Sequence, residues 1–235
     1  MTVEETMAEL QSLGDAQTKK TLMRHGAQEP LYGVKVADLK KVLKKTKKNH
    51  ALALELYKTG NSDAMYLAGL MADEKQVTRE QLQAWVEGAY WYYLSEFTVP
   101  WIAADSAHGY ALGLEWIESD KPLIAAAGWA TLASFAGVHA DETLDIEGYR
   151  ALLDRVEKEI HQAPNRVKYT MNGFVISVAS YVSELTAYAK RTANQIGPVE
   201  VFMGDTACKT PLASEYIEKV SARGSIGKKR KTARC

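Results

Sequence analysis

Ser95 and Glu96 stand side by side in an aromatic-rich stretch of the chain, GAYWYYLSEFTVPW at residues 88–101. A carboxylate such as that of Glu96 can stabilise a positive charge that develops on a reacting group. A serine hydroxyl becomes a nucleophile only when a neighbouring base activates it. Ser95 has neither a GxSxG context nor an evident histidine partner, so the stretch does not predict a nucleophilic serine.

The aromatic side chains of this stretch divide between core and flank when it is drawn as a helix of about 100° per residue. The side predicted to be core carries Tyr90, Tyr93, Leu94, Phe97 and Trp101. The neighbouring flank carries Trp91, Ser95 and Thr98, and the side opposite the core carries Tyr92, Glu96 and Val99. An exposed aromatic ring beside a groove can stack on a nucleobase. Trp91 therefore has two interpretations, a stacking platform or packing against the next helix pair. Pro100 predicts a kink or a helix end.

Positive charge is concentrated in two zones although the net charge of the chain is zero. Seven lysines occur between Lys35 and Lys48, and the last dozen residues contain no acid, whereas residues 80–120 hold seven acids and no lysine or arginine. Such clusters can bind polyanions such as nucleic acid, or can form a solvated helix face and a disordered tail. The candidate phosphate contacts are Lys40, Lys41, Lys44, Lys45, Arg166, Lys168, Lys228, Lys229, Arg230 and Lys231.

Apolar residues recur at helical spacing along the whole chain, and no convincing strand pair is found. First members of helix pairs are predicted to begin near residues 35, 62, 90, 121 and 165, and second members near 49, 78, 108, 145 and 183. Thr78 and Gln81 predict a capping box, and residues 199–203 could form a short extended piece. Paired helices that repeat in this way predict an all-α, HEAT-like solenoid whose concave side is a binding groove. We expect one solenoid domain over residues 1–222 and a basic tail over residues 223–235.

No cofactor, metal or membrane is expected as a partner. The five histidines form no HExxH pair, and the two cysteines, Cys208 and Cys235, are too few for a zinc site. Neither a P-loop nor a GxGxxG motif is present. No apolar run reaches the roughly 18 residues of a membrane span, and the start does not resemble a signal peptide, so we expect a cytoplasmic protein.

Several segments together resemble the DNA alkylation repair family, the AlkD-like HEAT-repeat DNA glycosylases. They are LYGVKVADLKKVLKK at 31–45, ALALELYKTGNSDAMYLAGLMAD at 51–73, QVTREQLQAWVEGAYWYYLSEF at 76–97, AAAGWATLASFA at 125–136 and VKYTMNGFV at 167–175. The resemblance implies a helical solenoid that holds duplex DNA in its groove. It also implies the removal of N3- or N7-alkylated purines by an aspartate, an arginine and tryptophans at the lesion.

The catalytic pattern of that family is incomplete in this sequence. The tryptophan before the acid falls on Trp91 and is retained, but the aspartate falls on Ser95. The arginine falls on Ala126 and the second tryptophan on Gly173. A serine cannot stabilise a developing cation as a carboxylate does, and Glu96 would be rotated about 100° away from the position.

Three hypotheses follow from the resemblance and these departures. The first is a protein that recognises duplex, damaged or branched DNA without excising bases. The second is an active glycosylase in which a displaced residue such as Glu96 does the electrostatic work, and the third is a scaffold whose groove holds a protein partner. A carboxylate at the centre of the concave wall, with a guanidinium opposite it, would contradict the first hypothesis.

Overall fold

The chain is all-helical in this computed structural model, which describes residues 1–204 and 206–234 and contains no β-strand among them. The α-helices in the first half are α1 (Val3–Ser12), α2 (Ala16–Arg24), α3 (Val36–Thr46), α4 (His50–Lys58), α5 (Ser62–Met71), α6 (Arg79–Gly88), α7 (Val99–Asp105) and α8 (Gly109–Trp116). Those in the second half are α9 (Pro122–Val138), α10 (Ile146–Glu159), α11 (Asn165–Tyr181), α12 (Thr186–Ile196) and α13 (Ala213–Ala222). A π-helix, η1 (Leu94–Thr98), precedes α7, and two 3₁₀ turns are η2 (Asp141–Thr143) and η3 (Ser183–Leu185).

The predicted all-α architecture is confirmed, and most predicted helix starts lie within one residue of the observed ones. Local sequence explains this agreement, because caps fix helix ends. Thr78 forms the predicted capping box with Gln81, and Pro122 is in the first turn of α9. Residues 199–203, predicted as a possible short extended piece, form neither a helix nor a β-strand.

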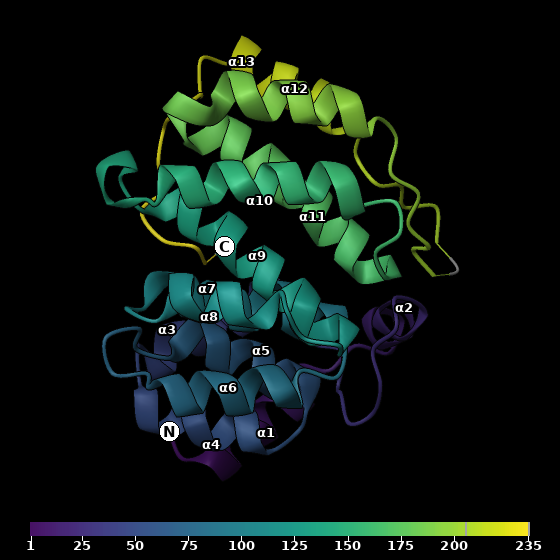
Figure 1. Ribbon diagram of the computed structural model, residues 1–235. Coiled ribbons are helices and arrows are strands. Elements are labelled where there is room, and N and C mark those ends of the chain that lie inside the picture. Colours follow the sequence, from purple (N-terminus) through teal and green to yellow (C-terminus); the bar gives the residue numbers. More distant parts are fainter. Residues whose placement is uncertain (205, 235) are drawn as a thin grey trace.

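The helices are stacked in two layers (Figure 1), with α4, α6, α8, α10 and α12 side by side in one of them. In the other layer, α5 contacts α3 and α7, α9 contacts α7 and α11, and α11 contacts α13. In the first layer, only the neighbouring helices α10 and α12 contact each other as extensively as the neighbouring helices of the other layer do. A stack curves toward the layer whose members are closer together, so the layer from α3 to α13 forms the concave side.

The core consists of two hydrophobic clusters that meet at α9. One cluster extends from Leu10 to Ala127 and also includes Ala233 of the tail, the other extends from Ile117 to Ile217, and Phe135 packs against both. Helix α9 is almost entirely apolar and fits closely against α8. A side chain at Gly128 would approach the backbone nitrogen of Ile117 to 2.6 Å. This continuity makes the solenoid a single stack in which α9 is the central helix.

The π-helix η1 changes which side chains of the aromatic stretch face the core. The wheel placed Glu96 and Val99 opposite the core, but both are buried, and Phe97 is partly exposed. A π-turn accommodates an extra residue and shifts the phase of all later positions. Pro100 lies at the next turn, in the start of α7, where its missing N–H is tolerated. The assumption of a regular helix was therefore wrong at these positions.

Candidate nucleic-acid interface

Trp91 is a core residue and not an exposed stacking platform. Its side chain is 3% exposed, and its indole Nε1 donates a hydrogen bond to the Ser62 hydroxyl at 3.0 Å. The rings of Tyr92 and Tyr93 lie against it with centroids 5.2 Å away. The prediction that Trp91 stacks on a base is contradicted, because the ring is enclosed by α5 and its own segment. The alternative, packing against a neighbouring helix pair, describes the structure.

Glu96 forms a bidentate ion pair with Arg166, which lies in the first turn of α11. Arg166 Nε is 2.6 Å from Glu96 Oε1, and Nη2 is 2.5 Å from Oε2. The guanidinium lies over the rings of Tyr92 and Tyr169, at 4.3 and 4.5 Å from their centroids. Glu96 is 5% exposed, and this burial raises the pKa of its carboxyl group to about 7 although Arg166 opposes the shift.

This pair is a carboxylate and a guanidinium, whose presence would argue for base excision. Each group, however, already has the other as its hydrogen-bond partner. The side chain of Glu96 is 2% exposed and that of Arg166 is 15% exposed, so neither is presented to the groove. The burial of Arg166 and its contacts with Glu96 and the two tyrosine rings argue against the predicted phosphate contact at this residue. Sequence reasoning missed the pair, since 70 residues separate its members.

The four lysines of α3 are exposed, as predicted from their spacing. Two of them have acidic neighbours, since Lys41 contacts Asp38 at 2.7 Å and Lys45 contacts Glu9 at 2.6 Å. Lys40 and Lys44 form no ion pair within the described residues. Lys168, on α11, is half-buried and lines a hollow together with Lys209 and the acidic Glu200.

The basic tail is attached to the solenoid along residues 227–234, which excludes the alternative of a disordered tail for this part of the chain. It runs back from α13 past the ends of α11 and α9 (Figure 1), and its last residues contact the ends of α7 and α5. Gly227 N donates to Ser180 O and Arg230 N donates to Gly137 O, both at 2.8 Å. Lys229 Nζ contacts Ala136 O at 2.8 Å and Asp141 Oδ1 at 2.6 Å. Cations at helix C-termini are favourable, so Lys229 has a structural role that the sequence analysis did not assign.

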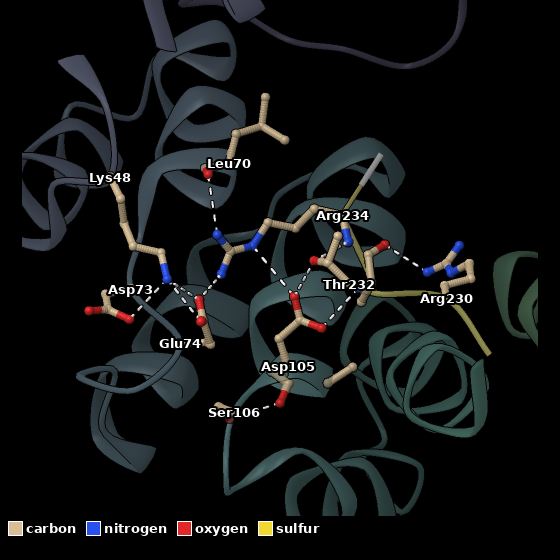
Figure 2. A network of polar contacts seen from close by, with 12 residues as sticks. Lys48, Leu70, Asp73, Glu74, Asp105, Ser106, Arg230, Thr232 and Arg234 are labelled. Atoms are coloured by element: carbon tan, nitrogen blue, oxygen red, sulfur yellow. Dashed lines mark hydrogen bonds and ion pairs between the residues drawn. The ribbon is translucent and has the colours of Figure 1, made fainter. Parts of the chain in front are cut away.

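Arg234 anchors the far end of the tail in a network of polar contacts (Figure 2). Its guanidinium donates to Leu70 O at 3.3 Å and to Glu74 Oε2 at 2.7 Å, and it faces Asp105. Asp105 accepts hydrogen bonds from the Thr232 hydroxyl and from the backbone nitrogen of Ala233. Ala233 between them is fully buried. Cys235 lies outside the described residues.

A cavity of about 610 Å³ opens beside this tail, between α9, α11 and α13. Its walls include the tyrosines Tyr169, Tyr181 and Tyr216 and the cations Arg223, Lys228 and Arg230. These three cations have exposed side chains and form no ion pair with any described residue. Of the predicted tail cations, Lys228 and Arg230 therefore border the cavity, while Lys231 is exposed beside the Arg234 network.

Residues 6–194 match the protein family described as DNA alkylation repair enzyme. The chain belongs to this family. Two curated relatives are the uncharacterized proteins Lin0241 of Listeria innocua and Lmo0209 of Listeria monocytogenes. They are 34% and 33% identical over 229 residues, which cover 95% of this chain and 99% of each relative.

A solved structure of a relative also matches the chain closely. It is 37% identical, with full coverage of both chains and a TM-score of 0.92. That protein is described as a new family of proteins related to the HEAT-like repeat DNA glycosylases with affinity for branched DNA structures. The fold is thus the HEAT-like repeat fold. No helix among the described residues is long and apolar enough to cross a membrane.

Residues without charge occupy the positions where the family resemblance implies catalytic groups. Ser95 is fully buried, and its hydroxyl has no hydrogen-bond partner among the described residues. Ala126 is fully buried inside α9. Gly173 faces the cavity, and a Cβ atom placed on it would meet nothing within 4 Å. At these three positions this member of the DNA alkylation repair family therefore has no charged side chain, and Gly173 borders an open space.

Proposed function

We propose that this protein binds DNA, and prefers branched DNA to continuous duplex, without excising bases. The observation that carries the proposal is the buried, uncharged Ser95 at the position where the family resemblance implies the catalytic aspartate. A cationic sugar in the transition state of base excision would find no negative partner there.

The distribution of free cations supports DNA as the ligand. Lys40 and Lys44 on α3 and Arg223, Lys228 and Arg230 beside the cavity are exposed, without ion pairs to described residues. Because α3 and the cavity lie at different ends of the concave layer, they can contact phosphates that are well separated along a bent or branched DNA. The related protein with affinity for branched DNA supports the preference for such structures. The cytoplasmic location expected from the sequence is part of this proposal.

A titration of duplex, nicked and four-way branched DNA over a salt series tests the proposal. We expect the branched DNA to bind most tightly, and all binding to weaken steeply as salt rises. Replacing Lys40 and Lys44 with alanine should reduce the slope of log K against log[salt] by about 2, because each lost duplex phosphate contact contributes about 0.9. The matched control is the Lys41→Ala, Lys45→Ala pair, which should change the slope less. Absence of salt-dependent DNA binding would instead favour a groove that holds a protein partner.

The Glu96–Arg166 pair gives the second candidate, base excision, its one specific support. The two groups have the charges that excision requires, and they would become catalytic only if DNA binding separated them. Incubation with alkylated DNA and measurement of released base tests this. The proposal of binding without excision predicts no release. If the native protein released the base and Glu96→Gln did not, the proposal of binding without excision would be wrong and the protein would be a glycosylase.

A further inference from the structure

We propose that the cavity between α9, α11, α13 and the tail receives one unstacked nucleotide from the branch point of the DNA. This inference rests on the proposed function and gives it a structural basis, because it names the feature of branched DNA that the protein recognises. It concerns a site on the second half of the solenoid, which borders the Glu96–Arg166 pair only through Tyr169, whose ring lies under the Arg166 guanidinium.

Small side chains on two neighbouring helices create the hollow. Helix α9 contributes Ala133, Ser134 and Gly137 to its wall, and α11 contributes Gly173 and Ser177. No atom lies within 4 Å of a Cβ placed on Gly173. The volume of about 610 Å³ lies within the range of roughly 300–1,000 Å³ that is usual for sites that bind small organic molecules. The space is therefore large enough for a nucleotide and is bounded by close-packed helices.

The lining has the two kinds of group that a nucleotide needs. Tyr181 and Tyr216 can offer aromatic faces to a base, and Tyr216 is 48% exposed, which is unusual for so large a side chain. Tyr169 also lines the cavity, but one face of its ring lies under the Arg166 guanidinium. The cations at the rim offer charge to a phosphate, and none of the described residues that line the cavity is acidic. The hydroxyl of Ser180, which is 3% exposed and also belongs to the wall, has no partner among described residues. An anionic aromatic ligand fits this combination better than a peptide or a cation does.

The tail fixes the cationic rim before any ligand arrives. Gly227 and Arg230 are attached through their backbone nitrogens to the last turns of α11 and α9, on either side of Lys228. The guanidinium of Arg230 also donates to Ala233 O at 2.7 Å, which restrains its direction. A preorganised rim loses little conformational entropy on binding. The attachment of the tail to the helix ends thus has a consequence for recognition as well as for stability.

Such a cavity discriminates between DNA structures through the cost of freeing a base. In a continuous duplex a nucleotide must be unpaired and unstacked, which costs a few kcal/mol, and the cost is least where the base is already unpaired. Where a branch point interrupts stacking or leaves a base unpaired, that nucleotide can enter the cavity at low cost. The predicted result is a preference for branched DNA that does not depend on base sequence.

The sharpest test fills the cavity. In Gly173→Trp the indole projects into the open space, whereas Gly173→Ala adds only one methyl group and serves as the matched control. We expect Gly173→Trp to lower the ratio of branched to duplex affinity about tenfold, with duplex affinity nearly unchanged, because one base–aromatic contact is lost. Gly173→Ala should keep the native ratio. A native ratio in a folded Gly173→Trp protein would overturn the inference.

Variants at the exposed rim keep the test decisive if Gly173→Trp does not fold, as judged by its far-UV circular dichroism. Tyr216→Ala and the double variant Arg223→Ala, Lys228→Ala should each lower the same ratio. The double variant should reduce the salt slope for branched DNA by about 1.4, because each lost contact to an unpaired strand contributes about 0.7. Lys231→Ala is the matched control, since this lysine is on the same tail but outside the cavity. Equal losses for the control and the rim variants would show that only general charge matters.

If the native protein binds no DNA, the proposed function fails. If the native protein binds DNA and the rim variants bind it equally well, only the inference about the cavity is refuted.

Discussion

Two arginines contact carboxylates from distant parts of the chain, and their surroundings differ. Arg166 pairs with Glu96 inside the concave layer, between two tyrosine rings. Arg234 contacts Glu74 and Asp105 at the ends of helices, where Lys48, Thr232 and backbone groups also take part (Figure 2). Glu96 thus has a single charged donor in a site that is closed to solvent, whereas Glu74 and Asp105 share several donors closer to solvent.

The difference appears as opposite shifts of the carboxyl pKa. Burial raises the pKa of Glu96 to about 7, because one arginine does not replace the lost hydration. Burial also raises the pKa of Glu74, but hydrogen bonds and charges from Lys48 and Arg234 outweigh it, so the pKa is lowered overall. The number of donors around a carboxylate, and its access to water, therefore decide the sign of the shift. An arginine partner alone does not.

The largest expected effect is a pH dependence of stability that depends on Glu96. Between the ordinary pKa of 4.5 and about 7, the folded state keeps a proton that the unfolded chain has lost. The contribution of Glu96 to the free energy of unfolding is therefore fully present below pH 4.5 and is lost as the pH rises through 7, by up to about 3 kcal/mol. Chemical denaturation of the native protein and of Glu96→Gln at pH 4 and pH 8 measures it. The stability of the native protein relative to the variant should fall with rising pH.

The matched comparison is Glu74→Gln, for which the sign is reversed. A lowered pKa stabilises the folded state above the unfolded pKa, and that contribution is lost as the pH falls through the folded value. If the stability difference between the native protein and Glu96→Gln were flat or rose with pH, Glu96 would be ionised in the folded state, and the contrast between the two sites would collapse.

Local patterns could predict the helices but not these contacts. Capping residues such as Thr78 and prolines such as Pro122 act within one turn, so their sequence signals are complete. The π-turn at η1 has no comparably local signal, and it rotates Glu96 from the predicted solvent side into the core. The partner of Glu96 lies 70 residues away, and the partner of Arg234 lies 160 residues away, so only the tertiary fold brings either pair together.

The roles of the cations in the basic tail could not be predicted from the sequence either. The charge of the tail was evident, but composition cannot separate a cation that binds phosphate from one that caps a helix. Lys229 and Arg234 are adjacent to carbonyl groups at the ends of α9 and α5, whereas Lys228 and Lys231 face solvent. Which cations contact the helix ends depends on where the tail touches the stack. The sequence of the tail alone does not determine this.

Arg234→Ala tests the second site and should have the next largest effect. The variant loses charged hydrogen bonds to Leu70 and Glu74, so we expect the free energy of unfolding at pH 7 to fall by about 2 kcal/mol. Lys231→Ala is the matched control and should change it by less than about 0.5 kcal/mol, since that side chain is exposed. Urea denaturation measures both. Equal values for the two variants would mean that the tail does not stabilise the solenoid.

The smallest effect is expected at Trp91, and it tests whether the region around Glu96 is structural. Phenylalanine keeps the aromatic packing but removes the hydrogen bond from the indole nitrogen to Ser62, which should cost about 1 kcal/mol of stability. Because Trp91 is enclosed, the affinity of Trp91→Phe for branched DNA should equal that of the native protein. Ser62→Ala removes the same hydrogen bond from the other side, so the double variant should be little less stable than either single one. A loss of DNA affinity in Trp91→Phe without a loss of stability would instead place this ring in contact with DNA. It would then add an aromatic contact with DNA in the first half of the solenoid to the lysines of α3 and the cavity in the second half.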